Sequence, residues 1–501
     1  MIISIDKRSL CNKIRSEFEN KEKLEKDLIL TNCLVSLVFV PGFSLLNFYN
    51  LALFFLMLCL VLSCSICCLN LKKRIVLLFF YLAMFLFLVT RILVPAVKGW
   101  DWWLNYSPEA NCFAVIAISI SIFFLLLGTL LMERYIKKKG ETLVQEKWFD
   151  KKSLKQVLRA ILFVCMICAC IMEIEKLVFM QGRAYEEYYI SYVSKMPFPI
   201  YFPAGCVNFF LCAFLALLPS KKESFIWLSV YILLAVQMLL IGIRNPIMLR
   251  CVFAFLYYFL RDIIRKKDEI KWIGKWETRL LIFSVPILIV FLGMYNYTRD
   301  NVKVDMSPVE VIVDFCYKQG TTYDTVLQGY MFREQLPNRE DKVYTIGALQ
   351  EEILYNSLGK KLFKANDIGS GNSVKRATEG KTFSHAISYV VMGEEYLNGH
   401  GRGSSFIIEN YVDFGYLGIV LYSVLLGGIC SYIALSFGKR WIMTVIGLMI
   451  LTNIFFTPRA EATAFLCFLV SYKFWFCIIG CLILGRVWQN REVIVKRIKR
   501  L

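Results

Sequence analysis

Arginine residues at the ends of apolar segments are the first candidates for chemistry in this chain. Arg244 ends one such segment, Arg459 lies in the turn between two others, and Arg402 lies in a glycine-rich run before a fourth. A guanidinium group is a planar fork of donors that binds phosphate oxygens in pairs. Three of them at one depth would bind a phosphate or diphosphate head group. Each could instead extend to lipid phosphates without any catalytic role.

Acid and base residues accompany these arginines. Glu409 and Asp413 are four positions apart, so on a helix they share one face at the outer membrane boundary. A partly desolvated carboxylate beside arginines can act as a general base, whereas the alternative is a pair of acids favoured by a helix N-terminus. Both histidines, His385 and His400, lie in the long polar segment 298–405. His400 is a second candidate base, because histidine titrates near neutrality.

The sequence predicts that this site needs neither a metal nor a cofactor. No GxxxxGK[ST] phosphate loop is present, and the long polar segment has no Asp-x-Asp. Glu173 is expected to pair with Lys176, three positions along a helix. Arg91 and Arg250 lie inside apolar segments, where each is a candidate for a buried ion pair.

Membrane-spanning helices must position these residues. The chain is 57% hydrophobic and 19% charged, whereas soluble domains are about 25% charged. A span needs about 20 apolar residues, and twelve segments come close to this length. They are 28–46, 48–69, 75–97, 111–132, 156–180, 203–219, 225–243, 247–264, 279–297, 411–436, 441–457 and 463–485. The turn between the first two falls at 41–44 or at 47–50. The prediction is an all-α polytopic membrane protein.

Short basic connections set the orientation of these spans. With twelve spans, the runs at 72–74, 137–139, 221–222, 265–267 and 439–440 and the basic tail all fall on one side. Both termini are then cytoplasmic, and the net charge of +19 reflects topology rather than nucleic-acid binding. The predicted regions are a cytoplasmic segment 1–27, nine spans in 28–297, an outer loop 298–405, three spans in 406–485 and a tail 486–501.

The polar segment 298–405, between the ninth and tenth spans, is predicted to be a large helical extracytoplasmic loop. Ser307-Pro308 is a typical helix start, followed by Val311, Ile312 and Phe315 on one stripe. Residues 349–358 and 386–396 also have amphipathic spacing. Gly369-Ser370-Gly371 predicts a flexible break between these two helices.

Three stretches carry a family resemblance. They are Gly242-Ile-Arg244, then Gly401-Arg-Gly-Ser-Ser405 with Glu409 and Phe414-Gly415-Tyr-Leu-Gly418, and Pro458-Arg459. With the large late loop, they resemble bacterial oligosaccharide repeat unit polymerases, the Wzy-type O-antigen and capsule polymerases. The resemblance covers the C-terminal half well, and the N-terminal half matches in hydropathy only.

The resemblance implies a GT-C-like, metal-independent glycosyltransferase in the bacterial cytoplasmic membrane. It would transfer a growing glycan from undecaprenyl diphosphate to the next lipid-linked repeat unit. Its partners would be undecaprenyl-diphosphate-linked glycans and membrane lipids. A chain-length regulator and a flippase are further candidate partners. Arg244, Arg459 and Arg402 would then bind the pyrophosphate, and Glu409 or His400 would take the acceptor proton.

Other membrane proteins of lipid-linked glycan metabolism remain alternatives. A flippase for lipid-linked oligosaccharides shares the size and basic character, but it needs charges along a central cavity rather than a large outer loop. A polysaccharide ligase uses the same donor and transfers the glycan to another acceptor. A membrane acyltransferase is less favoured, because no donor-binding signature is found on the cytoplasmic side.

Overall fold

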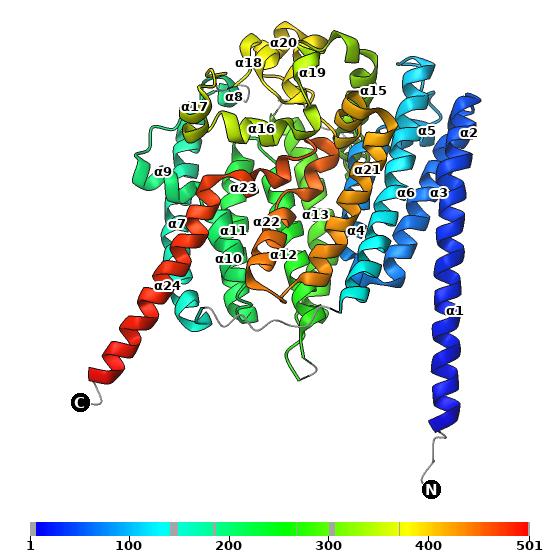
Figure 1. Ribbon diagram of the computed structural model, residues 1–501. Coiled ribbons are helices and arrows are strands. Elements are labelled where there is room, and N and C mark those ends of the chain that lie inside the picture. Colours follow the sequence, from blue (N-terminus) through cyan, green and yellow to red (C-terminus); the bar gives the residue numbers. More distant parts are fainter. Residues whose placement is uncertain are drawn as a thin grey trace.

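The computed structural model describes residues 7–140, 149–183, 187–266, 268–299, 306–369 and 371–498, and the elements assigned in these ranges are all helical. Long helices form a bundle, and a group of short helices covers one end of it (Figure 1). Both ends of the chain lie at the opposite end of the bundle. An all-α polytopic architecture is therefore confirmed.

Eight helical segments are long and apolar enough to cross a membrane. They are Asn20–Leu45, Tyr49–Leu69, Leu71–Val97, Pro108–Lys139, Lys151–Met180, Lys221–Leu240, Phe406–Ser436 and Trp441–Arg459. Two bent pairs, Phe198–Gly205 with Val207–Leu215 and Ala464–Val470 with Tyr472–Arg491, bring the count to ten if each pair is one span. These segments correspond to ten of the twelve predicted positions, so length and composition support eight to ten spans rather than twelve.

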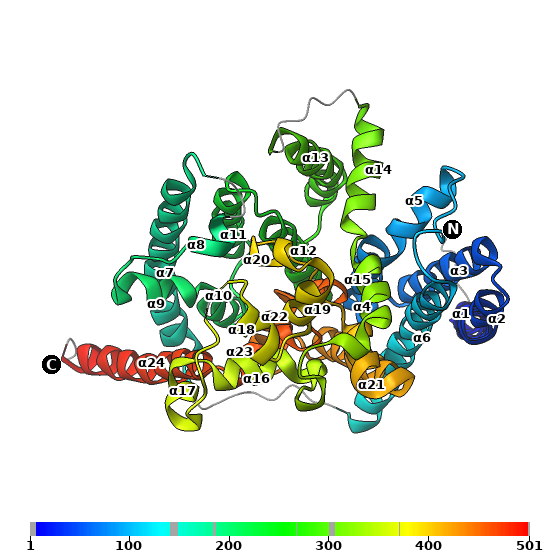
Figure 2. The same ribbon diagram turned by 90° about the horizontal axis from the view of Figure 1, so that it is seen from above.

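The other two predicted positions, 247–264 and 279–297, are also helical. They correspond to α12 (Asn245–Ile264) and α13 (Lys275–Arg299). Leu292 of α13 packs with Ile247 of α12 in one apolar cluster, and α13 lies at the edge of the molecule (Figure 2). Helix α12 carries the charged residues Arg250, Arg261 and Asp262, which makes it less apolar than the eight clear spans. Its Arg250 donates to the Tyr231 carbonyl (2.6 Å) rather than to a carboxylate.

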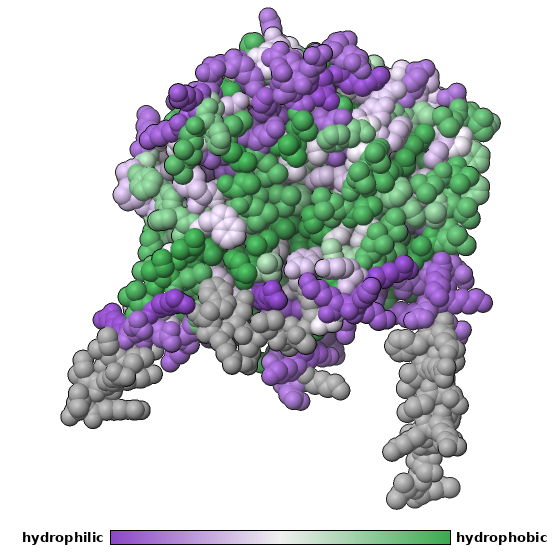
Figure 3. All heavy atoms as spheres, in the orientation of Figure 1, coloured by the Kyte–Doolittle hydropathy of each residue, from purple (hydrophilic) through white to green (hydrophobic). Residues whose placement is uncertain are grey.

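On the face seen in Figure 3, a belt of apolar side chains crosses the middle of the bundle, and hydrophilic side chains gather at both ends. At the end that carries the termini, basic residues pair across elements. Lys155 lies 2.6 Å from Glu223, and Lys221 pairs with Glu277. The predicted basic connection at 221–222 and the described residues Arg265 and Lys266 of the next one share this end, as expected for the polar boundary of a membrane protein.

The first two spans are separated by the later of the two predicted turns. Helix α1 (Lys7–Leu34) continues through the π-helix Val35–Phe39 into α2 (Val40–Leu45), which contains Pro41 and Gly42. The chain then turns at Asn47, whose φ is +60°, and α3 (Tyr49–Leu69) begins. The third span follows as α4 (Leu71–Met84), the π-helix η2 (Phe85–Val89) and α5 (Thr90–Val97).

Two long helices cross at very short range through small residues. They are α6 (Pro108–Lys139) and α21 (Phe406–Ser436). A Cβ added to Gly128 would lie 2.0 Å from the Val424 carbonyl oxygen, and one added to Gly427 would lie 2.0 Å from the Leu125 carbonyl oxygen. Small residues allow such backbone approach between membrane helices. This crossing fixes α21, which carries Glu409 at its outer end.

Short helices of the segment 306–405 form what we call the outer cap. Their bounds are α14 (Pro308–Gln319), α15 (Thr322–Met331), α16 (Gly347–Leu354), α17 (Ser357–Phe363), α18 (Val374–Glu379), α19 (Phe383–Met392) and α20 (Glu394–Leu397), with short 3-10 turns between α15 and α16. Seen from above, α18, α19 and α20 lie over the centre of the bundle, and α14 and α17 lie toward its edge (Figure 2).

The predicted helix start at Ser307-Pro308 is confirmed. Ser307 and Glu310 form a reciprocal capping box, and Val311 and Phe315 are buried along one stripe. The amphipathic segments 349–358 and 386–396 are each divided into two helices. In the first, Asn356 caps α17 and ends the continuity with α16. In the second, Gly393 adopts φ +55° between α19 and α20. Ser370, in the predicted break, lies outside the described residues.

Candidate active site

Arg459 lies in an irregular segment rather than in a tight turn. After α22 (Trp441–Leu451), the chain forms the 3-10 helices η6 (Ile454–Arg459) and η7 (Ala464–Leu466) and the short α23 (Cys467–Val470) before α24 (Tyr472–Ile498). Nη1 of Arg459 donates to the carbonyl (2.8 Å) and to the Oε1 (3.3 Å) of Gln319. The guanidinium also lies over the Phe87 ring of the third span. Arg459 therefore contacts both the outer cap and the bundle.

Arg91, at the outer end of the third span, reaches the same part of the cap. Its Nη2 lies 2.7 Å from Oδ2 of Asp324, and its guanidinium lies 4.2 Å from the centre of the Tyr317 ring. Gly320 packs directly on the Arg91 backbone, because an added Cβ would lie 2.6 Å from the Arg91 nitrogen. The expectation of a buried ion pair at Arg91 is confirmed, since the Asp324 side chain is only 8% exposed.

Arg402 approaches from the last part of the cap. Its carbonyl accepts a hydrogen bond from Thr325 (3.0 Å), and its N–H donates to the Ser388 hydroxyl (2.9 Å). Burial raises the pKa of the Asp324 carboxyl, and the charge of Arg402 lies close enough to oppose part of that rise. Next to it, Gly403 has φ +78°, and its Cβ position lies 3.5 Å from the Arg459 carbonyl oxygen. Arg402 is thus a neighbour of both Asp324 and the Arg459 segment.

One short stretch of the cap, residues 319–325, contacts all three arginines. We call it the linking segment; it joins the end of α14 to the start of α15. It is polar and buried, and its buried side chains are Gln319, Thr322, Tyr323, Asp324 and Thr325. Buried polar groups require partners, and the arginines supply several of them. A mixed polar run after an amphipathic helix was the only sequence signal for this segment, and the sequence did not predict it as part of the site.

Asp324 is the carboxyl group at the centre of this arrangement. Burial raises its pKa above the ordinary value, while Arg91, Arg402 and a hydrogen bond from Tyr106 oppose the shift. Burial and the nearby Asp324 charge raise the pKa of Tyr106 to about 12. A carboxyl group whose pKa is moved toward neutrality in a cluster of cations is typical of an acid–base site.

Arg244 lies at the start of α12, next to the same cap helix. Gly242, with φ +94°, turns the chain before it, and Pro246 begins the helix. One turn further, Ile247 packs in an apolar cluster with Phe315 of α14. Gln319, which binds Arg459, is one turn beyond Phe315. The start of α12, where Arg244 lies, is therefore near the end of α14, which carries Gln319 and its contact to Arg459.

Glu409 is fully buried, and its carboxylate connects two parts of the chain that are far apart in sequence. Its Oε1 accepts from the Ser404 hydroxyl (2.5 Å), and its Oε2 accepts from the Ala462 N–H (2.7 Å). The Ala462 carbonyl in turn accepts from the Tyr422 hydroxyl. Both carboxylate oxygens are therefore engaged, one by the end of the cap and one by the irregular segment after Arg459. This geometry positions Arg459 and leaves the Glu409 carboxylate away from solvent.

Asp413 occupies the same face of α21, as the four-residue spacing predicts. Its Oδ2 accepts from the N–H and the hydroxyl of Thr345 (both 2.7 Å), and its Oδ1 lies 3.2 Å from Arg339. The Thr345 carbonyl accepts from Thr463 (3.0 Å). Beyond Asp413, the helix breaks at Gly415, whose φ is +63° and ψ −155°. The segment Phe406 to Phe414 thus holds the cap rather than continuing the span below it.

Neither histidine ring has a hydrogen bond or ion pair to the three arginines among the contacts of the described residues. His400 is exposed, and its backbone is held by Glu395 and Asn372. His385 contacts the Tyr396 hydroxyl through Nδ1 (2.9 Å), and burial lowers its pKa to about 4, so it is neutral at physiological pH. In the described part of the chain, no group of three or more His, Cys, Asp or Glu residues could hold a metal ion.

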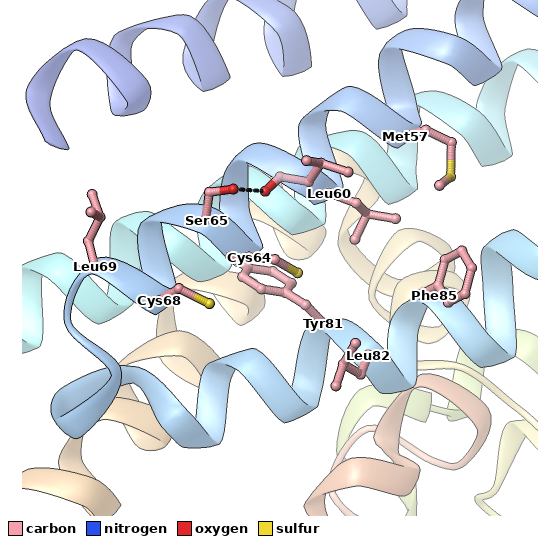
Figure 4. A pocket seen from close by; sticks show the side chains of 10 residues that line it. Met57, Leu60, Cys64, Ser65, Cys68, Leu69, Tyr81, Leu82 and Phe85 are labelled. Atoms are coloured by element: carbon pink, nitrogen blue, oxygen red, sulfur yellow. Dashed lines mark hydrogen bonds between the residues drawn. The ribbon is translucent and has the colours of Figure 1, made fainter. Parts of the chain in front are cut away.

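An apolar groove of about 550 Å³ lies elsewhere, between α3 and α4 (Figure 4). Leu60, Tyr81 and Phe85 are among its lining residues, and the Ser65 hydroxyl is turned to the Val61 carbonyl (2.8 Å). Its lining contains no charged side chain, so it offers no group for acid–base or phosphate chemistry.

Comparison with protein-family models identifies a family for this chain. A family model described as O-antigen polysaccharide polymerase Wzy matches residues 28–492, which covers the bundle, the cap and all three clustered arginines. None of the curated proteins or solved structures compared with the chain matches it. On the extent of that match, this chain belongs to the Wzy family of O-antigen polysaccharide polymerases.

Proposed function

We propose that this protein polymerises lipid-linked repeat units at the outer face of the cytoplasmic membrane. The growing glycan would move from undecaprenyl diphosphate to the next lipid-linked repeat unit. Family membership supports polymerisation in general. The observation that carries the finer proposal is the convergence of Arg91, Arg402 and Arg459 on the linking segment at the outer end of the bundle.

The reaction has two electrostatic requirements. An acceptor hydroxyl attacks the anomeric carbon of the donor's first sugar, the bond from that carbon to the diphosphate oxygen breaks, and the hydroxyl proton must leave. Negative charge develops on the departing diphosphate, and preorganised donors at that position lower the barrier. We assign this role to Arg91, Arg402 and Arg459, with Arg244 at the edge of the same helix as a further contact. The guanidinium of Arg91 has five N–H donors. Its ion pair with Asp324 uses only part of them, so the others can bind phosphate.

We assign the removal of the acceptor hydroxyl proton to Asp324. A general base works best when its pKa lies near the operating pH, and burial moves the pKa of this carboxyl upward. The Glu409 carboxylate already accepts two hydrogen bonds inside the protein, so we infer a positioning role for it. His400 remains a proposed second base, because its exposed ring is accessible from the cap surface.

The same proposal includes the membrane topology. Ten candidate spans together with α12 and α13 make twelve, which leaves both termini on the cytoplasmic side and the cap outside. The ion pairs of Lys155 and Lys221 at the end opposite the cap support this orientation. A chain-length regulator and a flippase are proposed partners on the family resemblance alone.

The direct test is reconstitution of the purified protein in liposomes with lipid-linked repeat units. A ladder of polymer should form without nucleotide sugar, and it should persist in EDTA if no metal takes part. A flippase would move the substrate and leave it as single units. A ligase would need a separate acceptor before any transfer occurred. If folded wild-type protein and intact substrate give no ladder, the proposal is refuted.

A further inference from the structure

A second cavity lies inside the outer cap, and we call it the cap cavity. Its volume is about 520 Å³, within the range of roughly 300–1,000 Å³ typical of small-molecule sites. Helices α16 to α19 form most of its wall, and Glu461 and Lys473 close it on the side of the bundle. None of the three clustered arginines lines it, so it is distinct from the proposed diphosphate site.

The charges of the cap cavity largely cancel. Four carboxylates and three cationic side chains line it. Lys360 lies 2.8 Å from Asp367, and Arg376 lies 3.6 Å from Glu351. His385 adds no charge, because its buried imidazole is neutral at physiological pH. With a small net negative charge, the cavity disfavours a diphosphate and accepts an uncharged ligand.

Hydrogen-bonding groups in this wall are still available. The Nε–H of Arg376 is buried without an acceptor in the described part of the chain. Among the described residues, Glu352 and Lys473 also line the cavity without an ion-pair partner. The Tyr355 hydroxyl is directed to the Glu379 carbonyl (3.5 Å), so its ring contributes an aromatic surface to the lining. A wall of aromatic surface, carboxylates and unused donors is suited to a ligand rich in hydroxyl groups.

The cap cavity and the arginine cluster are connected by two elements. Thr382, the N-cap of α19, and His385 within α19 lie in the cavity wall, and one turn later the Ser388 hydroxyl accepts from the Arg402 N–H. The segment after Arg459 enters the cavity at Glu461, which accepts from the Ser384 hydroxyl of α19. The contact to the Arg402 backbone and the cavity wall therefore lie on successive turns of α19, and the segment after Arg459 continues into the same wall.

We propose that the cap cavity is a subsite for the uncharged sugar residues of the substrate, next to the diphosphate. It would hold the repeat unit through hydroxyl contacts and determine which sugars are polymerised. This inference rests on the proposed function of the arginine cluster for its biological meaning. The binding itself is independent of that cluster and can be measured without catalysis.

The test uses the full-length protein in detergent and lipid-free oligosaccharides of one to three repeat units, cut by mild acid from the host's own surface polysaccharide. Saturation-transfer NMR and calorimetry measure binding. Ala348→Trp fills the cavity, and Tyr355→Ala removes its aromatic surface. Glu394→Ala changes an exposed acid of α20 outside the cavity and serves as the matched control. Arg459→Ala tests whether binding depends on the diphosphate site.

Wild type, Glu394→Ala and Arg459→Ala are expected to bind with similar affinity, and the two cavity variants should bind at least tenfold more weakly. Thermal unfolding shows whether each variant is folded. Unchanged binding by folded Tyr355→Ala and Ala348→Trp, or no binding by wild type at millimolar oligosaccharide, would overturn the subsite. If Arg459→Ala also polymerises normally, the proposed diphosphate site fails while the subsite stands.

Discussion

Arg91 and Asp324 form a 2.7 Å ion pair between the outer end of the third span and the second helix of the cap. Since one comes from the N-terminal fifth of the chain and the other from the late outer segment, the pair fixes the cap on the bundle. It also joins a proposed phosphate-binding guanidinium to the proposed proton acceptor. A change in either residue should therefore alter both binding and acid–base chemistry.

Arg459→Ala is expected to reduce polymer formation by about 100-fold or more, because loss of one preorganised donor commonly costs that much in rate. Arg459→Lys keeps the charge but loses the planar fork, so its activity should be intermediate. Polymer length on gels from cells that lack the native protein measures the effect. Arg183→Ala is the matched control, since that arginine is 46% exposed and pairs only locally with Glu187. Normal polymer in Arg459→Ala cells with normal protein levels would remove this residue from the mechanism.

Asp324→Asn is expected to lower kcat by roughly 10²–10⁴-fold, the usual contribution of a general base. The pH profile gives a sharper test. A base must be deprotonated, so the rate should fall as the pH drops through the raised pKa of Asp324. Arg91 opposes that rise, so Arg91→Ala should raise the pKa further and move the acidic limb to higher pH. An acidic limb that stays in place in Arg91→Ala would assign the proton to another group, with His400 the next to examine.

Glu409→Gln should retain much of the activity, whereas Glu409→Ala should destabilise the protein. Glutamine can still accept one of the two hydrogen bonds, but alanine leaves Ser404 and the Ala462 N–H without an acceptor. The cost is about 1–3 kcal/mol for each buried donor. Melting temperature in detergent and polymer yield together measure this. A folded Glu409→Gln protein as inactive as Asp324→Asn would instead favour a catalytic role for Glu409.

Gly128→Ala is expected to destabilise the bundle by about 1–3 kcal/mol, as overpacking of a tight interior does. The added methyl group would meet the Val424 carbonyl and separate α6 from α21. Gly480→Ala is the control, because it lies in α24 with open space around its Cβ position. Thermal unfolding of the two variants in the same detergent compares them. Equal stability would show that α6 and α21 can move apart at little cost.

The sequence predicted the membrane elements well because they depend on local composition. Runs of apolar residues near the required length identified helices at all twelve positions, and Asn47 marked one of the two predicted turns. The capping box at Ser307 and the pair of Glu173 with Lys176 (2.8 Å) also follow from short-range spacing. These features need no knowledge of distant parts of the chain.

The active-site arrangement could be predicted only in part, because it depends on long-range contacts. Arg402 and Arg459 were identified by their position at the membrane boundary, and they do lie at the linking segment. Asp324 carries no local signal, since it becomes unusual only when folding places Arg91 and Tyr106 beside it. The hydrogen bond from the Ala462 N–H to Glu409 likewise joins residues that are far apart in sequence.

The proposed proton acceptor Asp324 lies in residues 319–325, while the cap cavity is built largely from residues 348–385. The proposed catalytic carboxylate and most of the proposed sugar-binding wall therefore lie on separate stretches of the chain. A laboratory that wishes to make new polysaccharides can exchange the second stretch between polymerases and keep the first unchanged. Such chimaeras would retain the catalytic groups while acquiring the carbohydrate preference of the donor enzyme.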